Sequence, residues 1–162
     1  RRWTDVPLPP FQRLLDEYAG DLLRFCVASV GPDDGDDVFQ ETVVAALRAY
    51  PRLRHTDNLK GWLLTIAHRK ALDHHRSRAR RPVPADDLEP AAGAVNGAEP
   101  RDDTLWNAVH ALPPKQRGAV LLRFVGDLSH REIAAALGSS EDAARRSLAD
   151  GLAKLRKEWT PA

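Results

Sequence analysis

The sequence lacks methionine altogether and contains a single cysteine, Cys26. One cysteine cannot form an internal disulfide or a cysteine-rich zinc site. No uninterrupted apolar run approaches the roughly 20 residues that a membrane-spanning helix needs, and no apolar segment follows a basic start as in a secretory signal. We therefore expect a cytoplasmic protein with no membrane insertion. Because an initiator methionine is missing, we also expect the native start to lie upstream of Arg1.

The charges almost cancel in total, with 24 basic and 23 acidic side chains, but they are unevenly distributed. Residues 69–81 hold six arginine or lysine residues and a single aspartate, which together form a basic patch. Over 82–101 the composition changes to proline, glycine, alanine and acidic residues, without any aromatic residue. Such a segment cannot bury enough apolar surface to offset its ordering entropy. We predict a flexible acidic linker over 82–101 between two domains, 1–81 and 102–162.

The first domain has the apolar periodicity of helices. Apolar residues recur three and four positions apart over 11–26, which predicts a helix that Gly31 and Pro32 end. A second helix is expected to begin among the aspartates of 33–37, which suit the positive end of a helix dipole, and to end at Pro51. A third helix is expected to run into the basic patch. Its predicted inward-facing residues are Leu59, Trp62, Leu63, Ile66 and Ala67.

The second domain is also predicted to be helical. A short helix is expected to stop at Pro113, and Pro114 is suited to the first turn of the next. Residues 129–132, Ser-His-Arg-Glu, form a capping box that predicts a further helix start. Gly138 then suits a left-handed turn, and either of the two serines at 139–140 can cap a last helix. Since no alternating strand pattern is present, we predict an all-α fold with a helix-turn-helix in the second domain.

A helix-turn-helix and a basic patch in one chain both favour DNA binding. The second helix of such a unit fits the major groove and can present base-reading side chains, and here it carries Arg145 and Arg146. Each feature alone has a plainer explanation, because short helix pairs also occur as packing units and charged helix faces are usually only solvated. Their combination across a flexible linker strengthens the interpretation.

Segments of the first domain resemble a bacterial sigma factor of the small, two-domain extracytoplasmic-function type, the subunit that gives RNA polymerase its promoter specificity. Residues 36–42, Asp-Asp-Val-Phe-Gln-Glu-Thr, are similar to the region-two helix that docks on the largest polymerase subunit. Residues 58–63 and 66–74 are similar to the helix that engages the minus-ten element, and in that family the preceding loop, here 53–58, captures a flipped base. The resemblance implies polymerase binding by Asp37, Gln40 and Glu41.

The second domain resembles the region-four module of the same family, which reads the minus-thirty-five element. The similar segments are 112–117, 122–124 and 128–134. Both modules together imply a set of residues that contact DNA: Asn58, Lys60, Trp62, His68, Arg69, Lys70, His74, Arg76, Arg123, Arg145 and Arg146.

The recognition helix departs from the family's pattern. That helix commonly starts with Gly-Thr or Gly-Ser followed by Val-Lys-Ser-Arg, whereas 142–147 here reads Asp-Ala-Ala-Arg-Arg-Ser. Asp150 stands where a basic residue often follows. Glu141 and Asp142 suit the positive end of a helix dipole, yet they repel phosphates if they face the DNA backbone.

The resemblance implies a promoter-specificity subunit that binds core RNA polymerase, recognises and melts promoter DNA, and starts transcription of a small stress- or signal-responsive regulon. Core polymerase and promoter DNA are the implied partners, and an anti-sigma protein is a further one. Two other interpretations stay open: an autonomous helix-turn-helix regulator, and a sigma-like protein that docks on polymerase without initiating.

An enzymatic function is not expected. His68, His74 and His75 do not share one helical face with the spacing that three metal ligands need, and Cys26 belongs to an apolar stripe. The serine of the capping box is explained by capping rather than by catalysis. No glycine-rich phosphate-binding loop is present. We therefore expect no cofactor, no bound metal and no catalytic residue.

Overall fold

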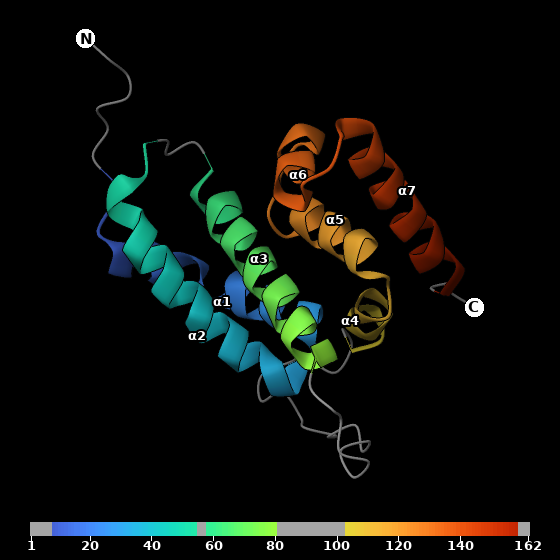
Figure 1. The fold of residues 1–162 in the computed structure, drawn as a ribbon, viewed down its shortest axis with the longest axis horizontal. Coiled ribbons are helices and arrows are strands. Elements are labelled where there is room, and N and C mark those ends of the chain that lie inside the picture. Colours follow the sequence, from blue (N-terminus) through green and yellow to red (C-terminus); the bar gives the residue numbers. More distant parts are fainter. Residues whose placement is uncertain (1–7, 55–57, 81–102, 159–162) are drawn as a thin grey trace.

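A computed structural model describes residues 8–54, 58–80 and 103–158. Within these ranges the chain forms seven α-helices and one short 3₁₀-helix, and no strand occurs among them (Figure 1). The predicted all-α fold is confirmed. The predicted linker, 82–101, lies outside the described residues, as do both of the domain boundaries that flank it. The elements are α1 (Phe11–Val30), α2 (Pro32–Ala49), η2 (Tyr50–Arg52), α3 (Leu59–Arg80), α4 (Asp103–His110), α5 (Pro114–Phe124), α6 (His130–Leu137) and α7 (Glu141–Glu158).

Helices α1, α2 and α3 form a first helical group. The chain turns between α1 and α2 at Gly31, whose φ of 94° is reached readily only by glycine. Pro32 then occupies the first turn of α2, where its missing amide costs nothing. The core of this group is apolar and fully enclosed, and it includes Leu22, Phe25, Cys26, Val38, Ala46 and Leu63.

Helices α4 to α7 form a second helical group that contains the helix-turn-helix. The predicted capping box is confirmed: the Ser129 hydroxyl accepts the Glu132 amide at 3.1 Å, and the Glu132 carboxylate accepts the Ser129 amide at 3.0 Å. Gly138 ends α6 in the predicted left-handed conformation, with φ of 66°. Of the two candidate serines, Ser140 caps α7, because its hydroxyl accepts the Ala143 amide at 3.1 Å. Local chemistry therefore sets both ends of α6 and the start of α7.

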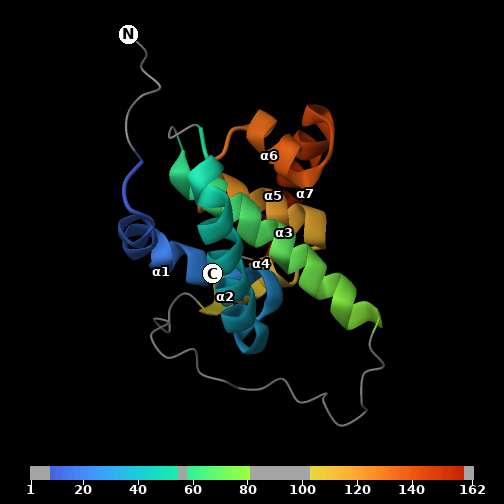
Figure 2. The same ribbon diagram turned by 60° about the vertical axis from the view of Figure 1, so that its left-hand side comes forward.

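The two helical groups pack against each other, which the sequence did not predict. Helix α3 lies beside α5 and α6, and α1 contacts α4 and α5 (Figures 1 and 2). The buried apolar residues of both groups form one continuous cluster. Leu64, absent from the predicted inward-facing set, is fully buried and lies close to Gly126 of the second group. Helix α3 is thus shared between two interfaces.

Candidate functional site

Helix α2 presents an exposed face that carries the predicted polymerase-binding residues. Asp37, Gln40 and Glu41 are all exposed there. One turn further along the same face, Val44 and Leu47 are 47% and 53% exposed. Large apolar side chains left open beside polar ones are typical of a protein-binding surface. We call this set, Asp37, Gln40, Glu41, Val44 and Leu47, the α2 face.

The opposite side of α2 explains why the α2 face points outward. Val38 and Ala46 are completely buried against α1 and α3. Thr42 is also buried, and its hydroxyl donates to the Val38 carbonyl at 2.7 Å, which satisfies the polar group inside its own helix. A shallow groove runs alongside the α2 face where α2 meets α3. Its lining residues are Gln40, Glu41, Val44, Ala45, Arg48 and Lys70.

The start of α3 holds three of the predicted DNA-binding residues in place. The Asn58 side-chain oxygen accepts the Gly61 amide at 2.9 Å and so caps the helix. The Lys60 ammonium lies 3.7 Å from the Asp21 carboxylate of α1. The half-buried Trp62 ring packs against Tyr50, with 6.0 Å between ring centroids. Residues 55–57 of the predicted base-capturing loop lie outside the described residues.

The basic patch on α3 is offset in part by aspartates. Arg76 lies 3.9 Å from the Asp73 carboxylate. Asp34 of α2 pairs with His74 at 3.2 Å and also with Arg78. Arg69 is exposed, and Lys70 is partly buried beside the groove described above. The basic side chains thus lie along the outer part of α3, and one of them, Arg78, forms an ion pair with α2.

His68 lies in a different environment from the rest of the predicted DNA-binding set. It is only 4% exposed and packs against Gly118 of α5. Burial, together with the charges of Arg69 and His75, lowers the pKa of His68 to about 4, so its ring is neutral near pH 7. A sequence signal for this position existed, because Leu64, His68 and His75 recur at positions i, i+4 and i+11 and therefore share one helical face.

Three side chains gather on the last carbonyls of α1, a cluster that the sequence did not predict. The Arg117 guanidinium of α5 donates to the Ser29 carbonyl at 2.7 Å and lies 3.2 Å from His75 Nε2. His75 Nε2 is in turn 3.1 Å from the Ser29 carbonyl. From α4, His110 Nδ1 lies 3.2 Å from the Ala28 carbonyl. Cationic and donor groups suit this end of α1, which carries the negative end of the helix dipole.

The helix-turn-helix displays the predicted arginines of α7 to solvent. Arg145 and Arg146 are exposed, and Arg145 pairs with Glu141 at 2.9 Å across one helical turn. Arg123 differs, since it is partly buried and donates to the Leu128 carbonyl at 2.9 Å, which fixes the segment between α5 and α6. Asp150 is exposed on α7. The described geometry therefore brings two arginines to the outside of the recognition helix.

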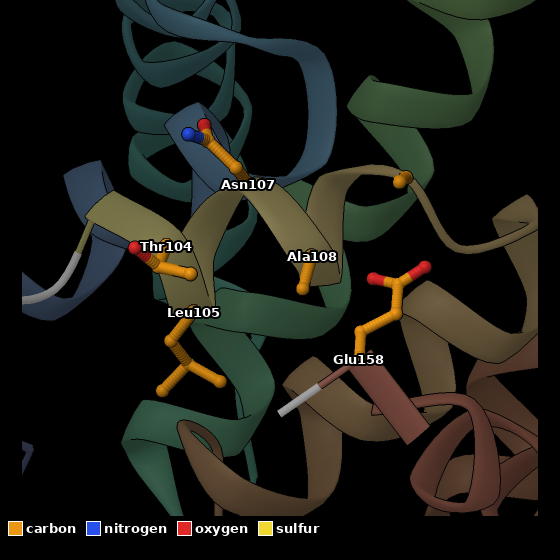
Figure 3. A pocket seen from close by; sticks show the side chains of 6 residues that line it. Thr104, Leu105, Asn107, Ala108 and Glu158 are labelled. Atoms are coloured by element: carbon orange, nitrogen blue, oxygen red, sulfur yellow. The ribbon is translucent and has the colours of Figure 1, made fainter. Parts of the chain in front are cut away.

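A second hollow lies between α4 and the end of α7 (Figure 3). Its described lining is Thr104, Leu105, Asn107, Ala108, Ala111 and Glu158. Among these residues only Glu158 has an ionisable side chain, so this lining supplies no second group for acid–base chemistry.

A metal site is also absent from the part of the chain that the structure describes. No three histidine, cysteine, aspartate or glutamate side chains approach one another there as metal ligands would. Cys26 is buried, and burial raises the pKa of its thiol to about 12, which keeps it protonated. None of the described helices is both long and apolar enough to cross a membrane.

Two protein families match the chain, each on one helical group. Sigma-70 region 2 matches residues 14–81, and Sigma-70 region 4 matches residues 102–155. The fold is also that of a solved sigma factor, RpoE. RpoE of Bartonella quintana, solved with the anti-sigma factor NepR, matches with a TM-score of 0.72 at 21% identity, covering 91% of this chain and 95% of RpoE. CnrH, solved with the cytosolic domain of CnrY, matches with a TM-score of 0.60 at 22% identity, covering 91% and 85%.

Known relatives indicate which class of sigma factor the chain belongs to. The ECF RNA polymerase sigma factor SigD of Mycobacterium tuberculosis is 35% identical over 150 residues, which cover 85% of this chain and 71% of SigD. RNA polymerase sigma factor SigV of Bacillus subtilis is 26% identical, with 90% and 89% covered. The chain belongs to the ECF RNA polymerase sigma factors. As a sigma factor, it acts in transcription initiation, and the resemblance seen in the sequence is confirmed.

Proposed function

We propose that this sigma factor directs core RNA polymerase to the promoters of a small stress- or signal-responsive regulon, and that it recognises and melts them. It has no catalytic step of its own in this proposal. The observation that carries the proposal is the separation of surfaces: the α2 face, the basic side of α3 and the arginines of α7 lie on different elements. One protein partner and two DNA segments can then be bound at once.

The α2 face is the proposed contact with core polymerase. Gln40 and Glu41 supply polar contacts and Asp37 extends them by one turn, while Val44 and Leu47 supply apolar area that binding would remove from water. Truncating the polar pair in Gln40→Ala/Glu41→Ala should weaken polymerase binding without unfolding the chain, since both side chains are exposed.

Helix α3 and the segment before it are the proposed reader of the minus-ten element. Lys60, Arg69, Lys70 and Arg76 would neutralise phosphates. Extruding a base costs a few kcal/mol of unstacking, so melting must draw on specific capture by the loop at 53–58 together with these charges. Further DNA contacts are proposed for Asn58, Trp62, His68 and His74.

Helix α7 is the proposed reader of the minus-thirty-five element. Arg145 and Arg146 are exposed, and they lie in the first half of the helix that a helix-turn-helix inserts into the major groove. Arg123 would support the contact from α5. The acidic stretch 82–101 would connect the two readers and, as in the family, follow the path of the emerging RNA.

An anti-sigma protein is the third proposed partner. RpoE, whose fold this chain shares, was solved with the anti-sigma factor NepR. The exposed apolar residues Val44, Leu47 and Phe124, the last 64% exposed, give an inhibitor apolar area on both helical groups.

In vitro transcription on a genomic promoter pool tests the proposal. The chain with core polymerase should yield transcripts from a limited set of start sites, and Gln40→Ala/Glu41→Ala should reduce them strongly. The matched control is Gln12→Ala/Glu17→Ala on the exposed side of α1, which should leave the transcripts unchanged. Binding to core polymerase without any transcript would contradict initiation and favour a factor that docks without starting transcription.

A further inference from the structure

The first half of α7 carries two acids, Glu141 and Asp142, followed one turn later by two arginines, Arg145 and Arg146. All four side chains are exposed, and each acid precedes an arginine by four positions, the spacing at which side chains on a helix meet. The Arg145 guanidinium donates to the Glu141 carboxylate at 2.9 Å. Within the described part of the chain, no ion pair joins Asp142 to Arg146. The two arginines are therefore held differently although both are exposed.

The inner side of α7 fixes the direction in which the Glu141–Arg145 pair faces. Ala144, Leu148 and Gly151 are buried where α7 packs on α5 and α6. The approach of α5 is close, since a Cβ atom added at Gly151 would lie 2.9 Å from a methyl carbon of Val120. A side chain on a rigid helix is placed more precisely than one on a loop. The fold therefore sets where the pair stands on the outer side of α7.

The orientation of a guanidinium decides which base it can read. Arginine donates two parallel hydrogen bonds to the O6 and N7 atoms of guanine in the major groove, and its planar fork must be aligned with the base edge. An exposed arginine samples many rotamers, and ordering them opposes binding. The contact of Glu141 at Arg145 Nη2 restricts these rotamers, and it leaves the guanidinium with donors for a second partner.

A carboxylate at the front of a DNA-binding helix also has a cost. It repels phosphates, so it lowers the affinity of α7 for every DNA sequence alike. Sequence discrimination, however, is a difference between two affinities. A carboxylate that aligns Arg145 increases this difference while it weakens the contacts that all sequences share. The Glu141–Arg145 pair thus favours selectivity over affinity.

We infer that Glu141 is a positioning residue for recognition of the minus-thirty-five element. Its carboxylate holds the Arg145 guanidinium so that α7 selects a guanine at one position of the element. Glu141 acts through Arg145 and makes no base contact of its own, whereas Asp142 contributes only its charge. The inference rests on the proposed function, which assigns Arg145 to the reading of this element.

Base preferences are measured by selecting, with the assembled holoenzyme, promoter fragments that are randomised across the minus-thirty-five element. The unaltered chain should enrich guanine at a position where Arg145→Ala loses the enrichment. Glu141→Ala should reduce that same enrichment several-fold and should strengthen binding to the other sequences. The matched control, Asp142→Ala, removes an equal charge from an exposed neighbour on the same turn. It should strengthen binding to all sequences and keep the guanine preference.

The double variant Glu141→Ala/Arg145→Ala tests whether the carboxylate acts through the guanidinium. Its preferences should equal those of Arg145→Ala alone. Thermal unfolding should shift alike in Glu141→Ala and Asp142→Ala, because each loses an acid at the positive end of the α7 dipole. A changed base preference is therefore not a consequence of lost helix stability.

Two results would overturn the positioning role and leave the proposed function standing. One is a Glu141→Ala holoenzyme that keeps the guanine preference lost in Arg145→Ala. The other is a further change of preference when Glu141→Ala is added to Arg145→Ala, because the carboxylate would then contact DNA directly. A holoenzyme of the unaltered chain that selects no sequence across the element would instead refute the proposed function of α7, and the positioning role with it.

Discussion

At the scale of single residues, the same side-chain type serves different purposes according to its surroundings. Arg145 is exposed and, among the described residues, forms an ion pair with Glu141, one turn away on its own helix. Arg123 instead donates to a backbone carbonyl, and Arg117 is partly buried between the two groups. Exposure, rather than residue type, makes Arg145 the better candidate for reading bases.

Arg145→Ala should therefore weaken binding to the preferred upstream element by about 1 to 3 kcal/mol if the guanidinium makes a bidentate base contact. Binding is measured with the assembled holoenzyme on promoters that differ only at the minus-thirty-five element. Lys154→Ala, an exposed cation later on α7, is the control and should have little effect. An equal loss on every promoter would instead indicate a phosphate contact.

At the scale of elements, α3 carries the largest local excess of positive charge. Phosphate contacts release counterions, so affinity should fall with salt, with a logarithmic slope of roughly 0.9 per neutralised phosphate on duplex DNA. Arg69→Ala and Arg76→Ala should each reduce the slope of holoenzyme binding by about 1. Arg13→Ala, exposed on α1, is the control. A slope that neither variant changes would exclude the basic patch from the DNA contact.

The limits of the helices could be predicted because local chemistry sets them. Gly31 with Pro32, the Ser129 capping box and Gly138 each act within a few residues, and each is found at its predicted position. The predicted end of α2 was less accurate. The helix stops at Ala49, and Pro51 lies in the short 3₁₀ turn that follows. The predicted linker and residues 55–57 of the base-capturing loop fall outside the described residues.

The packing of α3 against the second helical group could not be predicted in the same way. His68 and His75 count as polar in a periodicity argument, and only contacts with residues far along the chain bury them. The Arg117 cluster joins residues more than forty positions apart, a relation that no local pattern expresses. The surfaces of α2 and α7 were easier to anticipate, since their residues are exposed on single helices.

At the scale of the whole molecule, packing of the two groups should depend on pH. The pKa of His68 is lowered to about 4 in the packed form, against an ordinary 6.5, and burial also lowers the pKa of His75. A group with a lowered pKa stabilises the packed form above its ordinary pKa, and this stabilisation is lost as pH falls toward the lowered value. The other charged or titratable groups nearby are Arg69 and His74 on α3, His110 on α4 and Arg117 on α5.

Acidification from pH 8 toward pH 5 should therefore lower the energy transfer between dyes attached at Glu17→Cys and Ala153→Cys, which are exposed positions on α1 and α7. A pKa difference of one between two states corresponds to about 1.4 kcal/mol. Full protonation of His68 can therefore destabilise the packed form by at most about 3 kcal/mol. His68→Gln, which cannot gain a proton, should flatten much of the pH dependence. Transfer that rises on acidification would contradict this assignment.

The central claim is that this chain finds promoters only as part of RNA polymerase. The most direct measurement is copurification of the full chain with core polymerase, followed by binding of each species to promoter fragments that the holoenzyme transcribes. We predict a stable complex with core polymerase that binds these fragments tightly, and weak binding by the chain alone. A chain that fails to associate with core polymerase, yet binds its site unaided, would contradict the account.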